Sequence, residues 1–455
     1  MIPPEPVPAG PTRPRSRPDP ARSAVLVFGT SFAVGVVSLV NVLVTSRGLG
    51  VSGRGQVAFL LTVGGLLAHI STFGVQEANA NVASGASQRT GALATNSVLL
   101  ALVAGGLGSA VLLGLVHLFP ALGGTAPRWL LWLVLASMPV LVLGLYLQQL
   151  IVAHYLFRLF SAGTLLTPVL QAVVNTALAM TGVLSVTTVV CTWLAGQVIS
   201  AVVYAVVVHR RLGGFGRPDL ALARWSLAFG AKAHVGRTLT WGSYRADQWV
   251  VGVVAGDAVL GLYNVAVAWA EVLFLLPQAL TTVLRPDLVR ADAPTARRQT
   301  ATVVRMALLL SVPATVATVL LAPVLCVTLL GAQFAGSVTP LRILVLGCFG
   351  VIALKLYGVA LVSRGRPLLD SLAVGPALLL MLGLDLLLVP VAGANGAAAA
   401  SSIAYLAGGV LAAWLGMRVM GGTPRELVPR ASDIGAVRAL GRGFVRRLSA
   451  RTGPT

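Results

Sequence analysis

Five charged side chains lie inside long apolar segments of this sequence and are its strongest candidates for chemistry: Arg245, Asp247, Glu271, Lys355 and Asp385. A charge at the centre of a spanning helix costs at least about 2.5–3.5 kcal/mol, so each one needs a partner or a water-filled cavity. An arginine in such a cavity suits a phosphate, because its planar guanidinium binds oxyanions through two parallel hydrogen bonds. A carboxylate there can take up a proton or a cation. We therefore expect an anion-binding cavity, with Asp247, Glu271 or Asp385 as candidates for cation coupling.

The spacing of these residues restricts how they can pair. Arg245 and Asp247 are two residues apart, so on a helix they point about 200° away from each other and cannot simply pair. We expect one of them, Arg245, to face the cavity and the other to bond a neighbouring helix. Lys355 either binds the same anion or forms a structural ion pair with Glu271. Asn41 is a further cavity candidate, although a hydrogen bond between helices is the simpler interpretation.

The composition is that of an integral membrane protein. The chain has 455 residues, of which 56% are hydrophobic and 10% are charged, whereas a soluble domain carries about 25% charged residues. Its 33 Lys and Arg against 13 Asp and Glu give a net charge of +20. These charges lie in tails and short loops rather than on one folded face, so we expect the basic tails to contact anionic membrane lipids and expect no nucleic-acid binding.

No metal site, cofactor or catalytic domain is expected. The five histidines and three cysteines show no ligand spacing, and the two lysines, Lys232 and Lys355, do not form a G-K-[ST] phosphate loop. The predicted outer loops are too short to hold a catalytic domain. We therefore expect a protein that is not an enzyme.

Hydropathy windows of about 19 residues predict an all-α integral membrane protein with about twelve transmembrane helices in two six-helix lobes. The first lobe covers residues 23–208 and the second covers 238–418, with a polar cytoplasmic elbow at 209–237 between them. A Pro-rich N-tail, 1–22, is expected to be disordered, and a basic C-tail covers 419–455. The spans are predicted at 23–45, 56–78, 94–118, 129–152, 160–183, 187–208, 238–256, 258–284, 301–328, 341–363, 367–391 and 395–418, with the run 160–208 divided at Ser185.

The arginines are distributed asymmetrically between the two sides of the predicted bundle. With the N-terminus inside, the outer loops hold only Arg47, Arg54 and Arg128, whereas the tails, elbow and inner loops hold most of the others. Because cytoplasmic loops carry an excess of Lys and Arg, both termini are predicted to be cytoplasmic.

The two halves also share a pattern. Gly50 and Gly55 lie in the first outer turn, and Gly256 and Gly261 have the same spacing in the turn that precedes the eighth span. Six spans on each side of the elbow, in the same orientation, predict a parallel repeat about an axis normal to the membrane, as in rocking transporters.

Four short segments carry a family resemblance: Ser46-Arg47-Gly48-Leu49-Gly50 with Gly53-Arg54-Gly55, then Tyr244-Arg245-Ala246-Asp247, Gly261-Leu262-Tyr263-Asn264-Val265-Ala266 and Leu330-Gly331-Ala332-Gln333-Phe334. They are similar to motifs of the polysaccharide flippases, the Wzx-like branch of the multidrug/oligosaccharidyl-lipid/polysaccharide (MOP) exporter superfamily. The likeness covers roughly residues 23–418. One departure is Val51, where that family often has proline, and it leaves the geometry of the outer turn open.

The resemblance implies a two-lobed bundle that flips a polyprenyl-diphosphate-linked oligosaccharide across the bacterial cytoplasmic membrane for surface polysaccharide biosynthesis. It further implies alternating access around a cationic cavity. Arg245, Lys355 and Asn41 would then line the cavity, and Arg47 and Arg54 would stand at the outer gate. The partners expected are the lipid-linked oligosaccharide, membrane lipids and the polymerase or glycosyltransferases of the same pathway.

Two alternatives stay open. The first is a cation-coupled multidrug exporter of the same superfamily, whose cavity should expose acids and aromatic residues to cationic drugs. The second is a polytopic membrane glycosyltransferase or ligase, which would need a large outer loop with acidic or arginine side chains, and no such loop is predicted.

Overall fold

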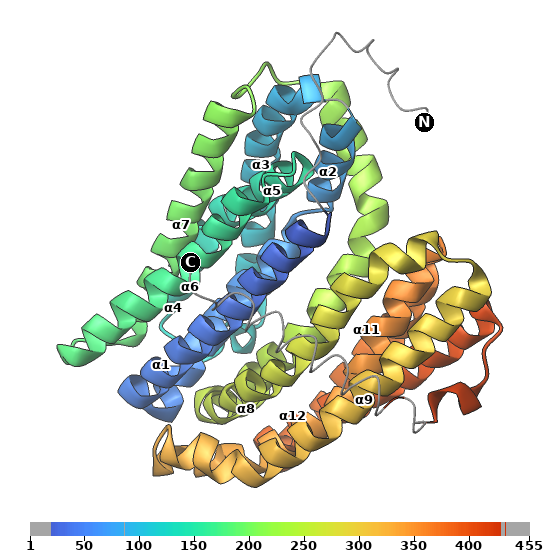
Figure 1. The fold of residues 1–455 in the computed structure, drawn as a ribbon. Coiled ribbons are helices and arrows are strands. Elements are labelled where there is room, and N and C mark those ends of the chain that lie inside the picture. The colour runs from blue at the N-terminus through green and yellow to red at the C-terminus, as the bar shows by residue number, and fades with distance from the viewer. Residues whose placement is uncertain (1–19, 86, 429–432, 434–455) are drawn as a thin grey trace, which may run out of the picture.

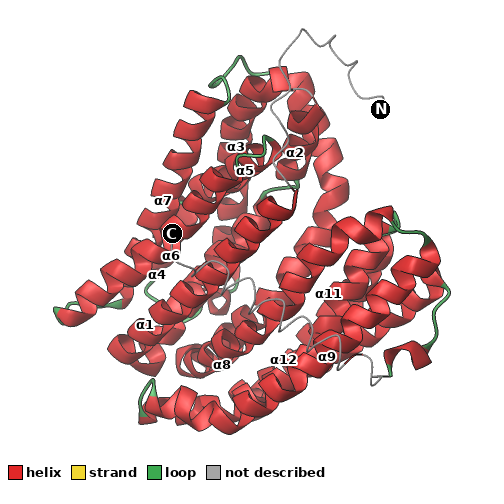
Figure 2. Cartoon of the chain, viewed as in Figure 1, coloured by secondary structure: helices red, strands yellow, loops and turns green. Residues whose placement is uncertain are grey.

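The computed structural model of the chain describes residues 20–85, 87–428 and 433. Its elements in these ranges are helices, and the model places no strand there (Figure 2). Short 3₁₀ and π turns link some of them. The α-helices are α1 (Pro20–Ser71), α2 (Val75–Gly85), α3 (Thr90–Leu118), α4 (Arg128–Ala136), α5 (Met138–Ala153), α6 (Phe157–Met180), α7 (Val186–Arg211), α8 (Leu220–Arg290), α9 (Ala293–Pro323), α10 (Val338–Leu344), α11 (Cys348–Ser363) and α12 (Pro367–Met420).

Within the described ranges, nine helical segments are long and apolar enough to cross a membrane. Three of them, α1, α8 and α12, double back on themselves. In α8, Arg245 and Glu271 are 2.8 Å apart, although 26 residues of straight helix would separate them by about 39 Å. In α12, Gly408 lies against Ala377 in the same way. Counting each doubled helix as two gives twelve crossings, which confirms the predicted number.

Each of these hairpins turns at a glycine. Gly50 has φ 69° and ψ −171°, Gly256 has φ 80° and ψ −179°, and Gly393 has φ 53° and ψ −128°. A side chain at such angles is strained, so glycine is required there. The close match between Gly50 and Gly256 supports the internal repeat inferred from the sequence.

The helices form two groups that spread apart from one end of the molecule (Figure 1). Helices α1–α7 make the first lobe and α8–α12 the second, with the first arm of α8 running along α1 and α2 before it reaches the second lobe. We call the end that carries Gly50, Gly256 and Gly331 the turn end, and the opposite end, with Pro20 and Met420, the terminal end. The lobes lie close together at the turn end.

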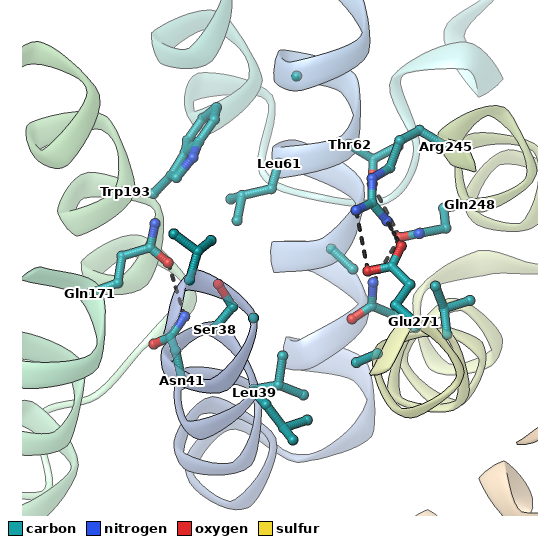
Figure 3. A pocket seen from close by; sticks show the side chains of 18 of the residues that line it. Ser38, Leu39, Asn41, Leu61, Thr62, Gln171, Trp193, Arg245, Gln248 and Glu271 are labelled. Carbon is teal, nitrogen blue, oxygen red and sulfur yellow. Dashed lines mark hydrogen bonds and ion pairs between the residues drawn. The ribbon is translucent and has the colours of Figure 1, made fainter. Parts of the chain in front are cut away.

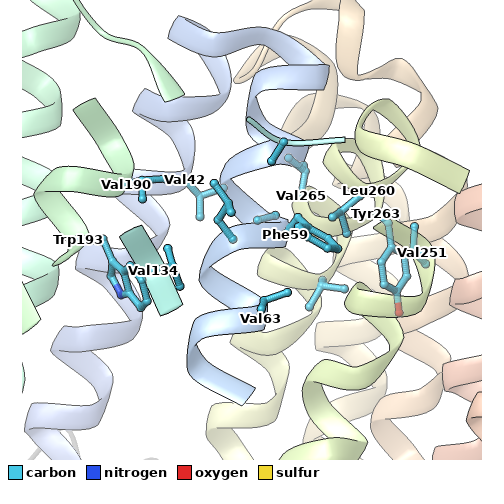
Figure 4. Close-up of a cluster of buried hydrophobic side chains, with 14 of the residues drawn as sticks. Val42, Phe59, Val63, Val134, Val190, Trp193, Val251, Leu260, Tyr263 and Val265 are labelled. Carbon is cyan, nitrogen blue, oxygen red and sulfur yellow. The ribbon is translucent and has the colours of Figure 1, made fainter. Parts of the chain in front are cut away.

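The backbones of the two hairpins touch at the turn end. A Cβ added to Gly55 would lie 1.8 Å from the carbonyl oxygen of Asp257, and one added to Gly261 would lie 2.0 Å from that of Val51. Next to this contact, the fully buried Phe59 of α1 lies beside Leu260 of α8, and both side chains face Gly252 (Figure 4). Large apolar side chains elsewhere are left exposed on the outside of the bundle, as in Val103 (69%) and Val391 (86%). This surface identifies a multi-pass membrane protein.

Two of the boundaries that differ from the prediction have a clear structural cause. The second span was expected to reach residue 78, but α1 ends at Ser71 because Phe73 and Gly74 have positive φ. This break lets Gly74 pack directly against the backbone of Gly230. The seventh span was expected to begin at 238, whereas α8 begins at Leu220 and makes one continuous helix with much of the elbow.

The division of 160–208 lies where it was predicted. Ser185 is the N-cap of α7, and its hydroxyl accepts a hydrogen bond from the backbone N–H of Thr188, while the Thr188 hydroxyl accepts one from the N–H of Ser185. This reciprocal capping box begins a new helix.

Part of the C-tail is fixed to the second lobe. Arg305 of α9 forms a buried, bidentate ion pair with Asp433. Its Nε lies 2.7 Å from Oδ2 and its Nη2 lies 3.0 Å from Oδ1. It also donates a hydrogen bond to the carbonyl oxygen of Glu426. The disorder predicted for 1–22 falls almost wholly outside the described residues, as does most of the C-tail.

Candidate functional site

The central cavity lies between the two arms of α1 and the two arms of α8 and has a volume of about 520 Å³ (Figure 3). Gln171 of α6 and Trp193 of α7 complete its wall. Because the two doubled helices belong to different lobes, the cavity is bounded by both. Its size is in the range of sites for small molecules.

Arg245, one of the predicted site residues, lines this cavity and pairs with Glu271. Its Nη1 lies 2.8 Å from Oε1 of Glu271, and its Nη2 lies 3.5 Å from Oε2 (Figure 3). Both side chains keep about a third of their surface accessible, 32% and 36%. The positive charge of Arg245 is therefore offset by a carboxylate that also lines the cavity.

Arg54 is the second arginine of the cavity, and it lies deeper than an outer-gate residue should. It is 7% exposed, and it donates from Nη1 to the Thr45 hydroxyl at 3.2 Å and from Nη2 to Oδ1 of Asn264 at 2.6 Å. No carboxylate of the described chain forms an ion pair with it, and its Nε has no hydrogen-bond partner there. The hydrogen-bond partners of this guanidinium in the described chain are thus uncharged groups.

Amide side chains hold the cavity wall in place. Asn41 donates to Oε1 of Gln171 at 2.9 Å and accepts from Nδ2 of Asn175 at 2.8 Å. On the other side, Asn264 donates to Oε1 of Gln248 at 2.7 Å, which links both arms of α8 to Arg54. Asn41 thus lines the cavity and also forms hydrogen bonds between helices.

Asp247 points away from the cavity into the second lobe. Its Oδ2 accepts a hydrogen bond from the Tyr263 hydroxyl at 2.6 Å and lies 3.3 Å from the hydroxyl of Ser401. Asp385 is fully buried, at 0% exposure, and neither of its carboxylate oxygens has a partner in the described part of the chain. The two acids that were candidates for cation coupling therefore lie inside the second lobe, apart from Glu271.

Lys355 lies outside the central cavity. It lines a different cavity of about 470 Å³ within the second lobe, which shares no lining residue with the central one. Its Nζ donates to Oε1 of Gln278 at 3.1 Å and stands 5.3 Å from the centre of the Tyr244 ring. The ion pair that the sequence suggested between Lys355 and Glu271 is replaced by the pair of Glu271 with Arg245.

Arg47 joins the two lobes at the turn end. Its Nε donates a hydrogen bond of 2.6 Å to the carbonyl oxygen of Leu329, which lies 282 positions further along the chain. Of the two arginines predicted at an outer gate, Arg47 thus stands at the closed end, and Arg54 lies beneath it. Among the residues described, no cluster of three or more His, Cys, Asp or Glu could hold a metal ion.

Sequence reasoning did not single out Gln248 and Asn264 as cavity residues or place Arg54 inside the cavity. A usable signal was present, because all three lie within about two turns of helix from the hairpin glycines Gly50 and Gly256. Polar groups on a spanning helix that close to a turn shared by two lobes are well placed to face the space between them.

Comparison with solved structures identifies the fold. The lipid II flippase MurJ, in an inward closed conformation, matches with a TM-score of 0.71 at 13% identity, covering 94% of this chain and 93% of that one. An inward-facing multidrug resistance MATE family transporter of the MOP superfamily matches with a TM-score of 0.68 at 14% identity, covering 87% and 98%.

A third structure with a similar fold is described by the polarity of its binding pocket. A MOP superfamily transporter from Pyrococcus furiosus, described as having a binding pocket of reversed polarity that suggests a different function, matches with a TM-score of 0.64 at 13% identity, covering 89% and 97%. At these identities the likeness establishes the fold, which is that of the MOP transporters.

Comparison by sequence identifies the family. A search of the curated proteins found no match. The family model described as "Polysaccharide biosynthesis protein" matches residues 44–339, which is well over half of the chain and includes the glycine turns Gly50 and Gly256. The chain belongs to this polysaccharide biosynthesis protein family.

Proposed function

We propose that this protein moves a polyprenyl-diphosphate-linked oligosaccharide from the inner to the outer leaflet of a bacterial cytoplasmic membrane, for surface polysaccharide biosynthesis. The observation that supports this most is Arg54, a buried arginine that lines the central cavity without an acidic partner in the described chain. A diphosphate would supply the negative charge that this guanidinium lacks, and its oxygens suit the planar donor fork.

The balance of charge in the cavity favours an anionic cargo. Among the described residues, its charged lining residues are Arg54, Arg245 and Glu271, two positive and one negative, so the net charge of this lining is +1. A multidrug exporter for cationic compounds would need the opposite sign, because a like charge in a cavity of low dielectric repels its ligand. We therefore favour the flippase over the drug exporter.

The proposed cycle uses the two lobes as alternating gates. The turn end would be the outer face and both termini would be cytoplasmic, as the arginine distribution predicts. The hydrogen bond from Arg47 to Leu329 would close the outer gate while the head group enters the cavity from the inner side. The lipid tail would remain in the bilayer, and separation of the hairpins at Gly55 and Gly261 would release the head group outside.

Cation coupling, where it operates, would use the second lobe. Glu271 is engaged by Arg245, so we assign the coupling role to Asp247 and Asp385. A buried carboxylate without a partner is costly when ionised and is relieved by a proton or a metal cation. The polymerase and glycosyltransferases of the pathway would be partners, and anionic lipids would contact the basic tails.

Reconstituted transport tests the proposal. Full-length protein in proteoliposomes is given a fluorescent polyprenyl diphosphate saccharide, and the fraction that reaches the opposite leaflet is measured with a membrane-impermeant quencher. We expect Arg54→Gln to abolish flipping and Arg54→Lys to retain part of it, since lysine keeps the charge but loses the fork. The control is Arg128→Gln, an exposed arginine at the start of α4.

Wild-type flipping by Arg54→Gln, with protein levels equal to the control, would remove the assignment of this arginine. Failure of the wild-type protein to move the saccharide lipid under any ion gradient would remove the proposed function itself.

A further inference from the structure

A second cavity opens inside the first lobe and differs in chemistry from the central one. It has a volume of about 440 Å³ and lies among α1, α5, α6 and α7, with Trp241 of α8 at its edge. We call it the N-lobe cavity. Among the described residues, its lining includes no Asp, Glu, Lys or Arg, whereas the two cavities described above both carry charged side chains.

Apart from His69, whose Nδ1 lies 2.8 Å from the carbonyl oxygen of Gly65, the polar groups that line this cavity are uncharged amides, hydroxyls and indoles. Gln148, Gln171 and Gln197 contribute amides, and hydroxyls come from Ser38, Thr164, Thr167, Ser200 and Tyr204. Some of these groups bond one another, as Nε2 of Gln148 does with the Tyr204 hydroxyl at 3.3 Å. Amides and hydroxyls both donate and accept hydrogen bonds, which is the capacity that sugar hydroxyls share.

Two aromatic side chains lie where the two cavities adjoin. Trp193 and Trp241 line both of them, together with Gln171. Trp241 is held by the ring of His69, whose centroid is 3.8 Å away. Flat indole faces cover the apolar C–H face of a sugar ring while neighbouring amides bond its hydroxyls, and a Trp combines a large apolar body with a polar N–H.

We infer that the N-lobe cavity is the subsite for an uncharged sugar of the head group, adjoining the diphosphate held in the central cavity by Arg54. This inference deepens the proposed function and rests on it. An uncharged sugar would exchange its water for the amides and hydroxyls of the wall. A sugar bearing a carboxylate would lose hydration with no Lys or Arg of the described wall to offset it, so the subsite discriminates against it.

Two residues allow the subsite to be changed without disturbing the diphosphate site. Gln197 lines the N-lobe cavity but not the central one, and its side chain makes no hydrogen bond that the described chain records. Gly144 also lines only the N-lobe cavity, and a Cβ added there would meet only Ala201, at an ordinary 3.8 Å. Gln197→Leu therefore removes the amide, and Gly144→Leu fills the space.

The experiment measures binding of three probes to the full-length protein in lipid nanodiscs by thermophoresis. The probes are undecaprenyl diphosphate, the same lipid carrying one N-acetylglucosamine, and the same lipid carrying one glucuronic acid. We expect the N-acetylglucosamine lipid to bind about fivefold more tightly than the bare lipid, the gain of one or two net hydrogen bonds. The glucuronic acid lipid should show no such gain.

Both variants should abolish this gain while leaving the affinity for bare undecaprenyl diphosphate unchanged. The matched controls are Gln149→Leu, the neighbouring amide outside the cavity, and Gly114→Leu, a glycine on the exposed face of α3 with nothing within 4 Å of an added Cβ. Both controls should behave as wild type.

The outcomes separate the two levels of the argument. If wild-type protein binds the bare and sugar-bearing lipids equally, or binds the glucuronic acid lipid most tightly, the subsite is overturned and the flippase proposal stands. The same holds if Gln197→Leu and Gly144→Leu keep the gain. If none of the three lipids binds, the proposed function fails and the subsite fails with it.

Discussion

The carboxylate of Glu271 lies 2.8 Å from the guanidinium of Arg245, across the two arms of α8, and this pair sets the charge of the central cavity. With the pair intact, the positive charge of Arg54 is left for a ligand. Without Arg245, the freed carboxylate would share the cavity with Arg54, and the net charge of the lining would fall from +1 to zero. We therefore propose that Arg245 acts partly by keeping Glu271 away from the proposed anion site.

Arg245→Ala is expected to lower transport of the saccharide lipid by at least about tenfold and to abolish glycan display in cells, with the protein still reaching the membrane. The double variant Arg245→Ala with Glu271→Ala restores the net charge of +1 and should regain a measurable part of the activity. Flipping in proteoliposomes measures both, as a double-mutant cycle. No rescue in the double variant would mean that Arg245 contacts the cargo directly rather than acting through Glu271.

Arg47 should set the stability of the closed turn end. Its hydrogen bond to the carbonyl oxygen of Leu329 connects the lobes at an exposed position, so Arg47→Ala should weaken closure by about 1 kcal/mol. Spin labels at the exposed positions Ser52 and Ala335, one on each lobe, report the separation. The distance distribution should shift toward longer values in Arg47→Ala and stay as in the parent protein in Arg128→Ala. An unchanged distribution in Arg47→Ala would contradict a gate role.

A substitution at Gly256 tests the backbone strain of the α8 turn alone, because an added side-chain carbon would contact nothing. Its φ of 80° strains any other residue, yet an added Cβ would find nothing within 4 Å. Gly256→Ala should therefore destabilise the protein by about 1–3 kcal/mol through the backbone alone. Gly106→Ala in α3, equally free of contacts but in a regular helix, should be neutral or slightly stabilising. Thermal unfolding in detergent compares the two, and equal melting temperatures would argue against the strained turn.

The sequence predicts the helices well because their causes are local. Apolar run length determines each crossing, Ser185 can cap the helix that follows it, and a glycine such as Gly50 allows the reversal at which two spans join. The helix end that was predicted wrongly has a cause far away in the sequence. The helix break at Phe73 and Gly74 accommodates the backbone of Gly230, which lies 156 positions away in the chain.

The same distinction explains which site residues were predicted. Arg245 was assigned to the cavity because an i, i+2 pair must point in different directions and a guanidinium suits a phosphate, and both are local properties of the sequence. The partner of Glu271 depends on how the two arms of α8 are rotated about their axes, and hydropathy does not determine that rotation. Arg54 was assigned to a loop because the span boundary was placed a few residues late, whereas the second arm of α1 begins directly after Gly50.

Asp385 carries the sharpest prediction for energy coupling. Its side chain is fully buried and both oxygens lack partners in the described chain, so an ionised carboxylate there costs stability unless a proton or cation relieves it. Asp385→Asn removes that cost and should stabilise the protein by about 1 kcal/mol or more. It should also make flipping independent of the imposed proton or sodium gradient. The measurements are thermal unfolding and transport in proteoliposomes with each gradient in turn, with Asp292→Asn at the exposed start of α9 as the control. A variant that keeps the gradient dependence of the parent protein would exclude Asp385 from coupling, and Asp247 would then be the remaining candidate in the second lobe.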